Sequence, residues 1–102
     1  MTKGILVVQS KPSSPDELGA FNHWYDAVHI PEILAIEGFR SARRFQAPDG
    51  EFYLAIYEVD DIEAAKAAMT AAGANGKTTP PTGVLLDPPP TTQWFEERLA
   101  GG

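Results

Sequence analysis

The chain has 102 residues, of which 43% are hydrophobic and 22% charged, and its formal net charge is -6. A chain of this size and composition forms one globular domain, which we expect to span residues 1–102. The negative charge argues against nucleic acid or an anionic membrane as a partner, because both surfaces repel it. The sequence has no Cys, which excludes disulfides, thiolate metal sites and Cys nucleophiles. Neither a signal-peptide pattern nor an apolar run of about 18 residues is evident, so a cytoplasmic protein is the expectation.

The N-terminal part of the chain predicts a strand followed by an amphipathic helix. Ile5 to Val8 is a continuous apolar run, which favours a strand covered on both faces. Ser14 is placed to cap a helix that has Pro15 at its first position. An apolar stripe along this helix must lie on the sheet, and it comprises Leu18, Phe21, Trp24 or Tyr25, and Val28.

A proline interrupts this helix. Pro31 lacks a backbone N–H and disfavours the α region for Ile30, so the helix is expected to end or kink near His29. A short second turn from Pro31 to Ile36 should follow it and end at Gly38, which suits a C-cap.

The middle of the chain predicts a β-hairpin. Phe39 to Gln46 is the second strand, and regular alternation would divide its faces into Phe39, Ser41, Arg43 and Phe45 against Arg40, Ala42 and Arg44. Pro48-Asp49-Gly50 supplies the turn. The third strand, Glu51 to Val59, is apolar on both faces, with Phe52, Leu54 and Ile56 opposite Tyr53, Ala55, Tyr57 and Val59.

A second helix follows the hairpin. Asp60 or Asp61 is placed to cap it, and its Ala-rich sequence from Ile62 to Ala72 favours helix and permits close packing. Gly73 and Gly76 are expected to end it.

The C-terminal part combines an irregular segment with a last strand. Thr78 to Pro90 is Pro-rich, with a brief extended piece expected at Val84 to Leu86, and forms either an arm or a lid. Thr91 to Leu99 is the last strand candidate, and Gly101-Gly102 is expected to be a frayed end.

The order of these elements, βαββαβ, is that of a ferredoxin-like α+β sandwich, in which an antiparallel four-stranded sheet carries both helices on one face. The other sheet face would be uncovered, although the first and third strands are apolar on both sides. Two such sheets facing each other would bury it. We therefore expect a homodimer with its sheets packed together and a pocket between sheet and helices in each subunit.

His29 is the principal candidate for catalysis. Phe21, Tyr25 and His29 follow one another at steps of four residues and share one helix face. Asp26, three residues before His29, is placed to orient the imidazole and to stabilise its charged form, so burial would be needed to hold the pKa near neutrality. A His–Asp pair beside an aromatic pocket suits proton abstraction next to a carbonyl. The alternative is a structural Asp26–His29 pair that closes the helix end.

Two other polar residues of this helix, His23 and Asn22, are each either part of the site or simply exposed surface residues. His23 lies about 120° around the helix from His29, which disfavours a two-His metal site and favours a solvated position. We expect no metal and no cofactor. Asn22 lies one turn before Asp26 and either orients it or is simply a surface residue.

Several aromatic residues are candidates for substrate contacts. Trp24 and Tyr25 are core residues or pocket wall, although the Tyr25 hydroxyl is able to donate to a substrate oxygen. Tyr53 and Tyr57 lie on one face of the third strand. They donate in the same way if that face meets the helices, and otherwise they fill the dimer interface.

Three arginines lie on the second strand, where alternation sends Arg43 to the face opposite Arg40 and Arg44. At least one guanidinium therefore points into a covered layer and needs an anionic partner. The partner is either a substrate carboxylate or enolate, or a structural carboxylate such as Glu32, Glu37 or Glu58.

The run from Trp24 to Phe45, WYDAVHIPEILAIEGFRSARRF, resembles the W-Y-D-x-x-H-x-P-E and G-F-x-x-A-R-R-F segments of the EthD-like branch of the dimeric α+β barrel superfamily. The resemblance implies a ferredoxin-like subunit whose sheets pair in a barrel. The superfamily includes muconolactone isomerases, polyketide cyclases, cofactor-free quinone-forming monooxygenases and haem proteins. Carried over by position, the implied polar site is Asp26 and His29, with Trp24, Tyr25 and one of the arginines between 40 and 44 around it.

The first functional hypothesis is a small cofactor-independent enzyme of the isomerase, cyclase or lyase type. Its substrate would be an aromatic, polyketide-like or unsaturated-lactone small molecule. His29 would be the general acid/base, Asp26 its orienter, and Tyr25 or an arginine the group that stabilises an enolate. The substrate contacts would come from Trp24, Phe21, Arg40, Arg44, Tyr53 and Tyr57.

Two other hypotheses use the same scaffold. One is a haem-binding or cofactor-free monooxygenase, with His29 as the axial ligand in the haem case. The other is a non-catalytic dimer that binds a small apolar ligand or assists a neighbouring enzyme.

Overall fold

The structure is a computed structural model that describes residues 2–98. Leu99, expected in the last strand, and the end expected to fray at residues 101–102 lie outside the described residues. Four strands form one sheet: β1 (Gly4–Ser10), β2 (Phe39–Gln46), β3 (Tyr53–Val59) and β4 (Thr91–Glu96). The helical elements are η1 (Pro15–Glu17), α1 (Leu18–His23), η2 (Trp24–His29), α2 (Ile30–Leu34) and α3 (Ile62–Ala74). Within the described residues, no helix is long and apolar enough to cross a membrane.

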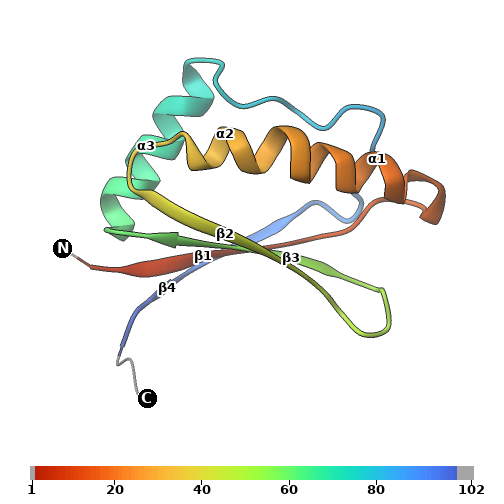
Figure 1. The fold of residues 1–102 in the computed structure, drawn as a ribbon, viewed down its shortest axis with the longest axis horizontal. Coiled ribbons are helices and arrows are strands. Elements are labelled where there is room, and N and C mark those ends of the chain that lie inside the picture. Colours follow the sequence, from red (N-terminus) through yellow and green to blue (C-terminus); the bar gives the residue numbers. More distant parts are fainter. Residues whose placement is uncertain (1, 99–102) are drawn as a thin grey trace.

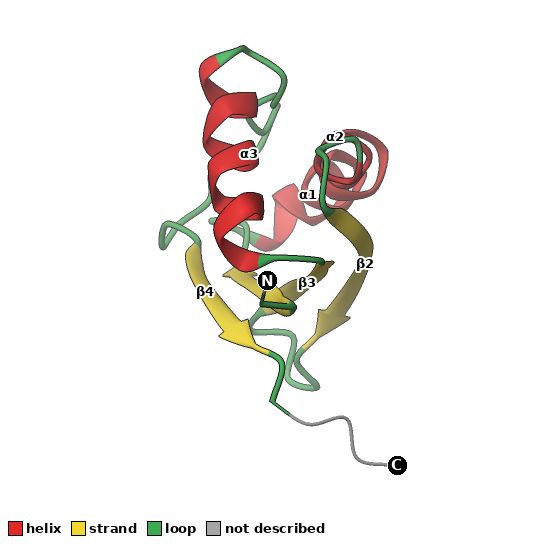
Figure 2. Cartoon of the chain, turned by 90° about the vertical axis from the view of Figure 1, so that its left-hand side faces the viewer, coloured by secondary structure: helices red, strands yellow, loops and turns green. Residues whose placement is uncertain are grey.

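The sheet has the strand order β2-β3-β1-β4, and each neighbouring pair is antiparallel. Within residues 2–98, all of the helices lie over one face of this sheet and no element covers the other face (Figures 1 and 2). The predicted ferredoxin-like sandwich is confirmed. The expected hairpin turn also forms, with the N–H of Gly50 donating to the carbonyl of Ala47 and a φ of 76° at Gly50.

The start of α3 is fixed to β1 by a cap and a close approach. The Asp61 side chain accepts hydrogen bonds from the backbone N–H groups of Ala64 (3.0 Å) and Thr2 (2.7 Å), so Asp61 is the cap. A Cβ at Gly4 would lie 2.2 Å from the carbonyl oxygen of Phe95 and 2.5 Å from Cδ1 of Ile62, so only glycine fits there. The sequence predicted that Gly73 would end the helix, but α3 continues to Ala74.

The first helix does not end or kink at His29, contrary to the prediction from Pro31. The helical dihedral angles continue through Ile30, which has φ −61° and ψ −47°, and the helix runs on to Leu34 (Figure 1). Trp24–His29 is a π-helical segment, in which the N–H of Ile30 donates to the carbonyl of Tyr25, five residues earlier. This wider turn directly precedes Pro31. A regular α-helix would not accommodate Pro31, because proline lacks a backbone N–H and its ring is bulky.

The faces of β2 differ from regular alternation because a β-bulge lies between Phe39 and Ser41. Phe39 pairs with Val59, whereas Ser41 pairs with Glu58. The extra residue moves the buried Phe39 onto the helix-covered face, which it shares with Ala42 and Arg44. Ser41, Arg43 and Phe45 occupy the opposite face.

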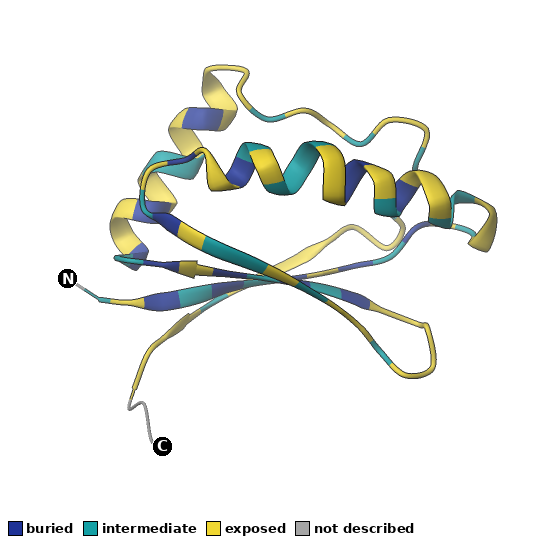
Figure 3. Ribbon diagram, in the orientation of Figure 1, coloured by how far each residue is buried: buried dark blue, intermediate teal, exposed yellow. Residues whose placement is uncertain are grey.

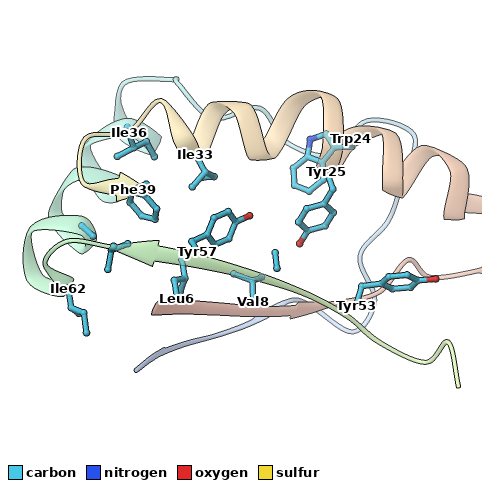
Figure 4. Packing of buried hydrophobic residues seen from close by; sticks show 14 of the residues in the cluster. Leu6, Val8, Trp24, Tyr25, Ile33, Ile36, Phe39, Tyr53, Tyr57 and Ile62 are labelled. Carbon is cyan, nitrogen blue, oxygen red and sulfur yellow. The ribbon is translucent and has the colours of Figure 1, made fainter. Parts of the chain in front are cut away.

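The core lies between the helices and the sheet. Alternate residues of β1 and β3 are buried there, as the banding of Figure 3 shows. The face of β3 that carries Tyr53 and Tyr57 meets the helices, so these tyrosines are core residues (Figure 4). The other sheet face, here called the outer face, carries the apolar side chains of Ile5, Val7, Phe45, Leu54, Ile56 and Phe95, which are half-buried or exposed.

Candidate functional site

Four aromatic rings of the first helix form a continuous row. Phe21 contacts Tyr25 with ring centroids 5.1 Å apart, and Tyr25 contacts His29 edge-on at 5.3 Å. The His29 ring lies flat against Trp24, with a centroid distance of 4.4 Å and an interplanar angle of 19°. The predicted shared face of Phe21, Tyr25 and His29 is therefore present, and the π-helical turn brings Trp24 to the same histidine.

His29 is half-buried, and its Nδ1 atom is fully buried without a hydrogen-bond partner. Burial lowers the pKa of His29 from its ordinary value of 6.5, and the nearby carboxylate of Glu32 opposes part of this shift. The imidazole is consequently neutral at neutral pH. A neutral imidazole with an unpartnered nitrogen is able to act as a base.

Asp26 does not bind His29. Its exposed carboxylate accepts a hydrogen bond from Nη1 of Arg44 at 3.1 Å, while Nη2 of Arg44 donates to the side-chain oxygen of Asn22 at 3.0 Å. The expectation that Asp26 orients the imidazole is therefore wrong. Asn22 and Asp26 instead hold an arginine of β2, because both point from the helix toward the sheet edge.

Arg44 is the arginine that enters the covered layer. Its guanidinium lies 4.7 Å from the ring centroid of Tyr25, 5.6 Å from that of Phe21 and 6.0 Å from that of Tyr53. Its anionic partner is Asp26, rather than any of the three glutamates considered from the sequence.

A surface cavity of about 300 Å³ opens at this arginine, between the helix and the edge of the sheet. It is lined by Asn22, Asp26, Arg44, Phe45, Gln46 and Tyr53. A second cavity of about 440 Å³ lies between α2 and α3 and includes Glu32. Neither of these two cavities within residues 2–98 is lined by His29 or Tyr57. The cavity at the sheet edge therefore carries Arg44 and Asp26, and not His29, as its charged residues.

Two tyrosine hydroxyls lie inside the layer between helix and sheet (Figure 4). The Tyr25 hydroxyl and the Ser10 hydroxyl are 2.9 Å apart and hydrogen-bonded. The Tyr57 hydroxyl is buried and has no partner among the described residues. Burial raises the pKa of both tyrosines, so both remain protonated at neutral pH.

Three sequence candidates lie outside this cluster. Arg40 is exposed and pairs with Asp60 at 2.7 Å, because the bulge turns it away from the helices. Arg43 lies on the outer face over the ring of Phe45, at 4.9 Å. His23 is exposed, and within residues 2–98 no group of three or more His, Asp or Glu side chains is placed to hold a metal.

Sequence analysis missed two residues that contact the cluster. Ser10 continues the alternation of Leu6 and Val8, and this pattern already placed its hydroxyl on the buried face of β1. Thr79 binds both Trp24 and Glu32 from the Pro-rich segment. No local pattern indicated Thr79, because its contacts span about half of the chain.

No protein-family model matches the sequence, and a search of curated proteins found no match. Solved structures do match. The Mycobacterium tuberculosis protein Rv0793 superposes with a TM-score of 0.75 at 16% identity, covering 99% of this chain and 100% of that one. The monooxygenase ActVA-Orf6 of Streptomyces coelicolor, solved with nanaomycin D, has a TM-score of 0.66 at 17% identity, with 97% and 90% coverage.

An ethyl tert-butyl ether degradation (EthD) family protein of Bacillus halodurans matches with a TM-score of 0.56 at 22% identity, covering 93% of this chain and 99% of that one. The chain has the dimeric α+β barrel fold. The resemblance noted in the Trp24 to Phe45 run is thereby confirmed for the fold. Since a dimeric α+β barrel supports many chemistries, the function has to be argued from the site.

Proposed function

We propose that this protein is a cofactor-independent enzyme that transfers a proton on an aromatic, polyketide-like or unsaturated-lactone small molecule. His29 is the general acid/base. The observation that carries the proposal is the pair of buried, unpartnered polar atoms, Nδ1 of His29 and the hydroxyl oxygen of Tyr57, on the two sides of the helix–sheet layer.

Unpartnered polar atoms inside a protein are costly. Each loses its hydrogen bonds to water and costs about 1–3 kcal/mol unless a partner replaces them. The described chain has one more such atom, the Ser41 hydroxyl, but Ser41 lies on the other side of the sheet. His29 approaches the layer from the helix and Tyr57 from β3. A ligand that offers polar atoms to both would recover the cost.

The chemistry follows from the charge states of these groups. Neutral His29 accepts a proton from the carbon next to a substrate carbonyl, and the electron pair moves to the carbonyl oxygen. Protonated Tyr57 donates a hydrogen bond to this enolate oxygen, and the positive charge of Arg44 stabilises it further. Return of the proton from His29 to a different carbon completes an isomerisation. The same enolate is the starting point of a cyclisation or a dehydration.

The remaining residues bind the substrate or hold these groups in this proposal. Trp24 and Phe21 form apolar walls, and the Tyr25 ring separates His29 from Arg44. The substrate enters at the 300 Å³ cavity, which neither His29 nor Tyr57 lines, so it reaches them only when Arg44 moves away from Asp26. The Asp26 carboxylate is exposed whereas the Arg44 side chain is largely buried, so an anionic group of the substrate has to replace Asp26 as the partner of this guanidinium.

A second candidate is oxygenation, which the fold similarity to the Streptomyces coelicolor monooxygenase favours. Here His29 removes the phenolic proton of a hydroxyarene, and O₂ oxidises the phenolate. One oxygen atom enters the ring as a quinone oxygen, and the other leaves as water. Haem titration separates the haem alternative, because a haem protein would show a Soret band that is lost in H29A.

A panel assay distinguishes these reactions. Unsaturated lactones, hydroxyaryl ketones and nanaomycin D are incubated with the protein in D₂O, and exchange of carbon-bound protons is followed by NMR while an electrode records O₂. Proton transfer predicts exchange without O₂ uptake, and oxygenation predicts O₂ uptake without added cofactor. If no compound exchanges, reacts or binds, the enzyme proposal fails. Saturable binding without turnover identifies the non-catalytic ligand-binding alternative.

We also propose a homodimer formed through the outer face. Phe45 and Phe95 on this face are 39% and 43% exposed, and Ile5, Val7, Leu54 and Ile56 lie on the strands between them. An apolar surface of this extent on a small soluble domain marks an interaction site. A second copy supplies a matching apolar surface, since a two-fold axis brings the same patch of each subunit together.

A further inference from the structure

Glu32 is the carboxylate one helical turn after His29. It lies three residues after His29 on the same helix, a spacing at which side chains are neighbours. Glu32 also opposes the effect of burial on the pKa of His29, as a nearby negative charge does. The sequence pattern favoured Asp26 for this place, but Asp26 is held by Arg44.

Thr79 fixes the carboxylate of Glu32. The backbone N–H of Thr79 donates to one carboxylate oxygen at 2.8 Å, and its hydroxyl donates to the other at 2.7 Å. These hydrogen bonds lower the pKa of Glu32 and keep it ionised. A carboxylate held through both oxygens has little freedom to rotate.

Thr79 also holds the ring on which His29 is stacked. Its carbonyl oxygen accepts a hydrogen bond from the indole N–H of Trp24 at 3.1 Å. Trp24 in turn lies flat against the imidazole. A single residue therefore anchors both groups that flank His29, the indole plane and the carboxylate.

The Pro-rich segment that carries Thr79 is attached to the first helix at a second point. From α3 it passes along α2 and α1 before it enters β4 (Figure 1). Near its other end, the N–H of Leu85 donates to the carboxylate of Glu17 at 2.7 Å, and the N–H of Ser13 donates to the carbonyl of Leu85 at 2.8 Å. The position of Thr79 is thus restrained from both sides.

We propose that Glu32, held by Thr79, stabilises the charged form of His29, which is one of the two roles expected of Asp26, while Thr79 positions the imidazole through Trp24. The proposal rests on the proposed function for the catalytic meaning of His29. In catalysis the imidazole becomes positively charged when it takes a proton, and the fixed carboxylate of Glu32 stabilises this charge. Thr79 and Trp24 keep the carboxylate and the ring plane in place while this happens.

The charged groups of the other packed elements do not take this role. On β2, Arg44 is paired with Asp26. On β3, Tyr57 is uncharged at neutral pH, because burial raises its pKa. Lys77, at the start of the link to the Pro-rich segment, lines the cleft between α2 and α3 and is exposed. Within the described chain, Glu32 is the charge that shifts the pKa of His29.

NMR titration tests the proposal without a substrate. The chain contains two histidines, so H23Q assigns the two imidazole C–H signals. We expect the midpoint of His29 to move to lower pH in E32Q, because the neutral amide no longer stabilises the imidazolium, and to recover in E32D. The matched control E37Q removes the same charge from an exposed position and should leave the midpoint of His29 unchanged.

The role of Thr79 has its own readout. Its backbone N–H donates to Glu32, so its amide hydrogen should exchange several-fold faster in E32A than in E37A. Equal His29 midpoints in E32Q and E37Q, or equal Thr79 exchange in E32A and E37A, would overturn the proposal. The outcome is separable from the proposed function, since full turnover in H29Q together with a shifted midpoint in E32Q would remove only the assignment of His29 as the general acid/base.

Discussion

The variant H29Q is expected to lower kcat on the most reactive panel substrate by about 10²–10⁴-fold, the usual contribution of a general acid/base. Gln has a similar volume and still fills the space against Trp24, but it takes up no proton at neutral pH. The matched control is H23Q, because His23 is exposed and lies outside the aromatic cluster. Steady-state kinetics together with a circular dichroism spectrum separate lost chemistry from lost fold.

The pH profile identifies the proton acceptor in the same experiment. Because burial lowers the pKa of His29 below 6.5, the base stays neutral at pH 7, and kcat/KM should fall only when the pH drops through this lowered value. H29Q should lack this acid limb, whereas H23Q should keep it.

Tyr57 completes the test of this prediction. Y57F removes the unpartnered hydroxyl and should cost about 10²-fold in kcat, as the loss of one donor to an oxyanion does. Because Tyr57 and His29 act on one substrate, the double variant should lose less than the two single effects combined. Full activity in H29Q with an unchanged acid limb would refute the assignment of the base.

The second large effect is expected at the outer face. I56R places a charge in the middle of the proposed dimer interface, and the two-fold axis places a second one nearby. Burying such charges costs several kcal/mol each, so the dimer Kd should rise by about a thousandfold or more. The matched control A67R puts the same charge on an exposed position of α3. Analytical ultracentrifugation should show a monomer for I56R and a dimer for A67R, and a monomeric parent protein would contradict the interface.

The strands and their order were predictable because buried strands leave a clear pattern in a sequence. Alternation in β3 correctly placed Tyr53 and Tyr57 on one face, and the turn at residues 48–50 correctly joined β2 to β3. The apolar outer face was predictable as well, since β1 and β3 carry apolar residues on both sides.

Two local backbone features were not predictable from the residue pattern. Pro31 is a reliable helix breaker in a regular α-helix, but the π-helical turn before it lets the helix continue to Leu34. The bulge after Phe39 shifts the alternation of β2 by one residue. Both are backbone rearrangements that depend on tertiary packing, which periodicity does not record.

The site was predictable in its aromatic part and not in its charges. The steps of four residues placed Phe21, Tyr25 and His29 in a row. The same spacing argument paired Asp26 with His29. The carboxylate of Asp26 instead binds the positively charged guanidinium of Arg44 from β2. Long-range partners of this kind are not visible in a local pattern.

A crystal structure of the protein with the panel compound that exchanges fastest tests the central claim most directly. We expect polar atoms of the compound within hydrogen-bonding distance of Nδ1 of His29 and the hydroxyl of Tyr57, with Arg44 moved from Asp26. A compound bound instead in the cavity between α2 and α3, with both atoms still unpartnered, would contradict the account.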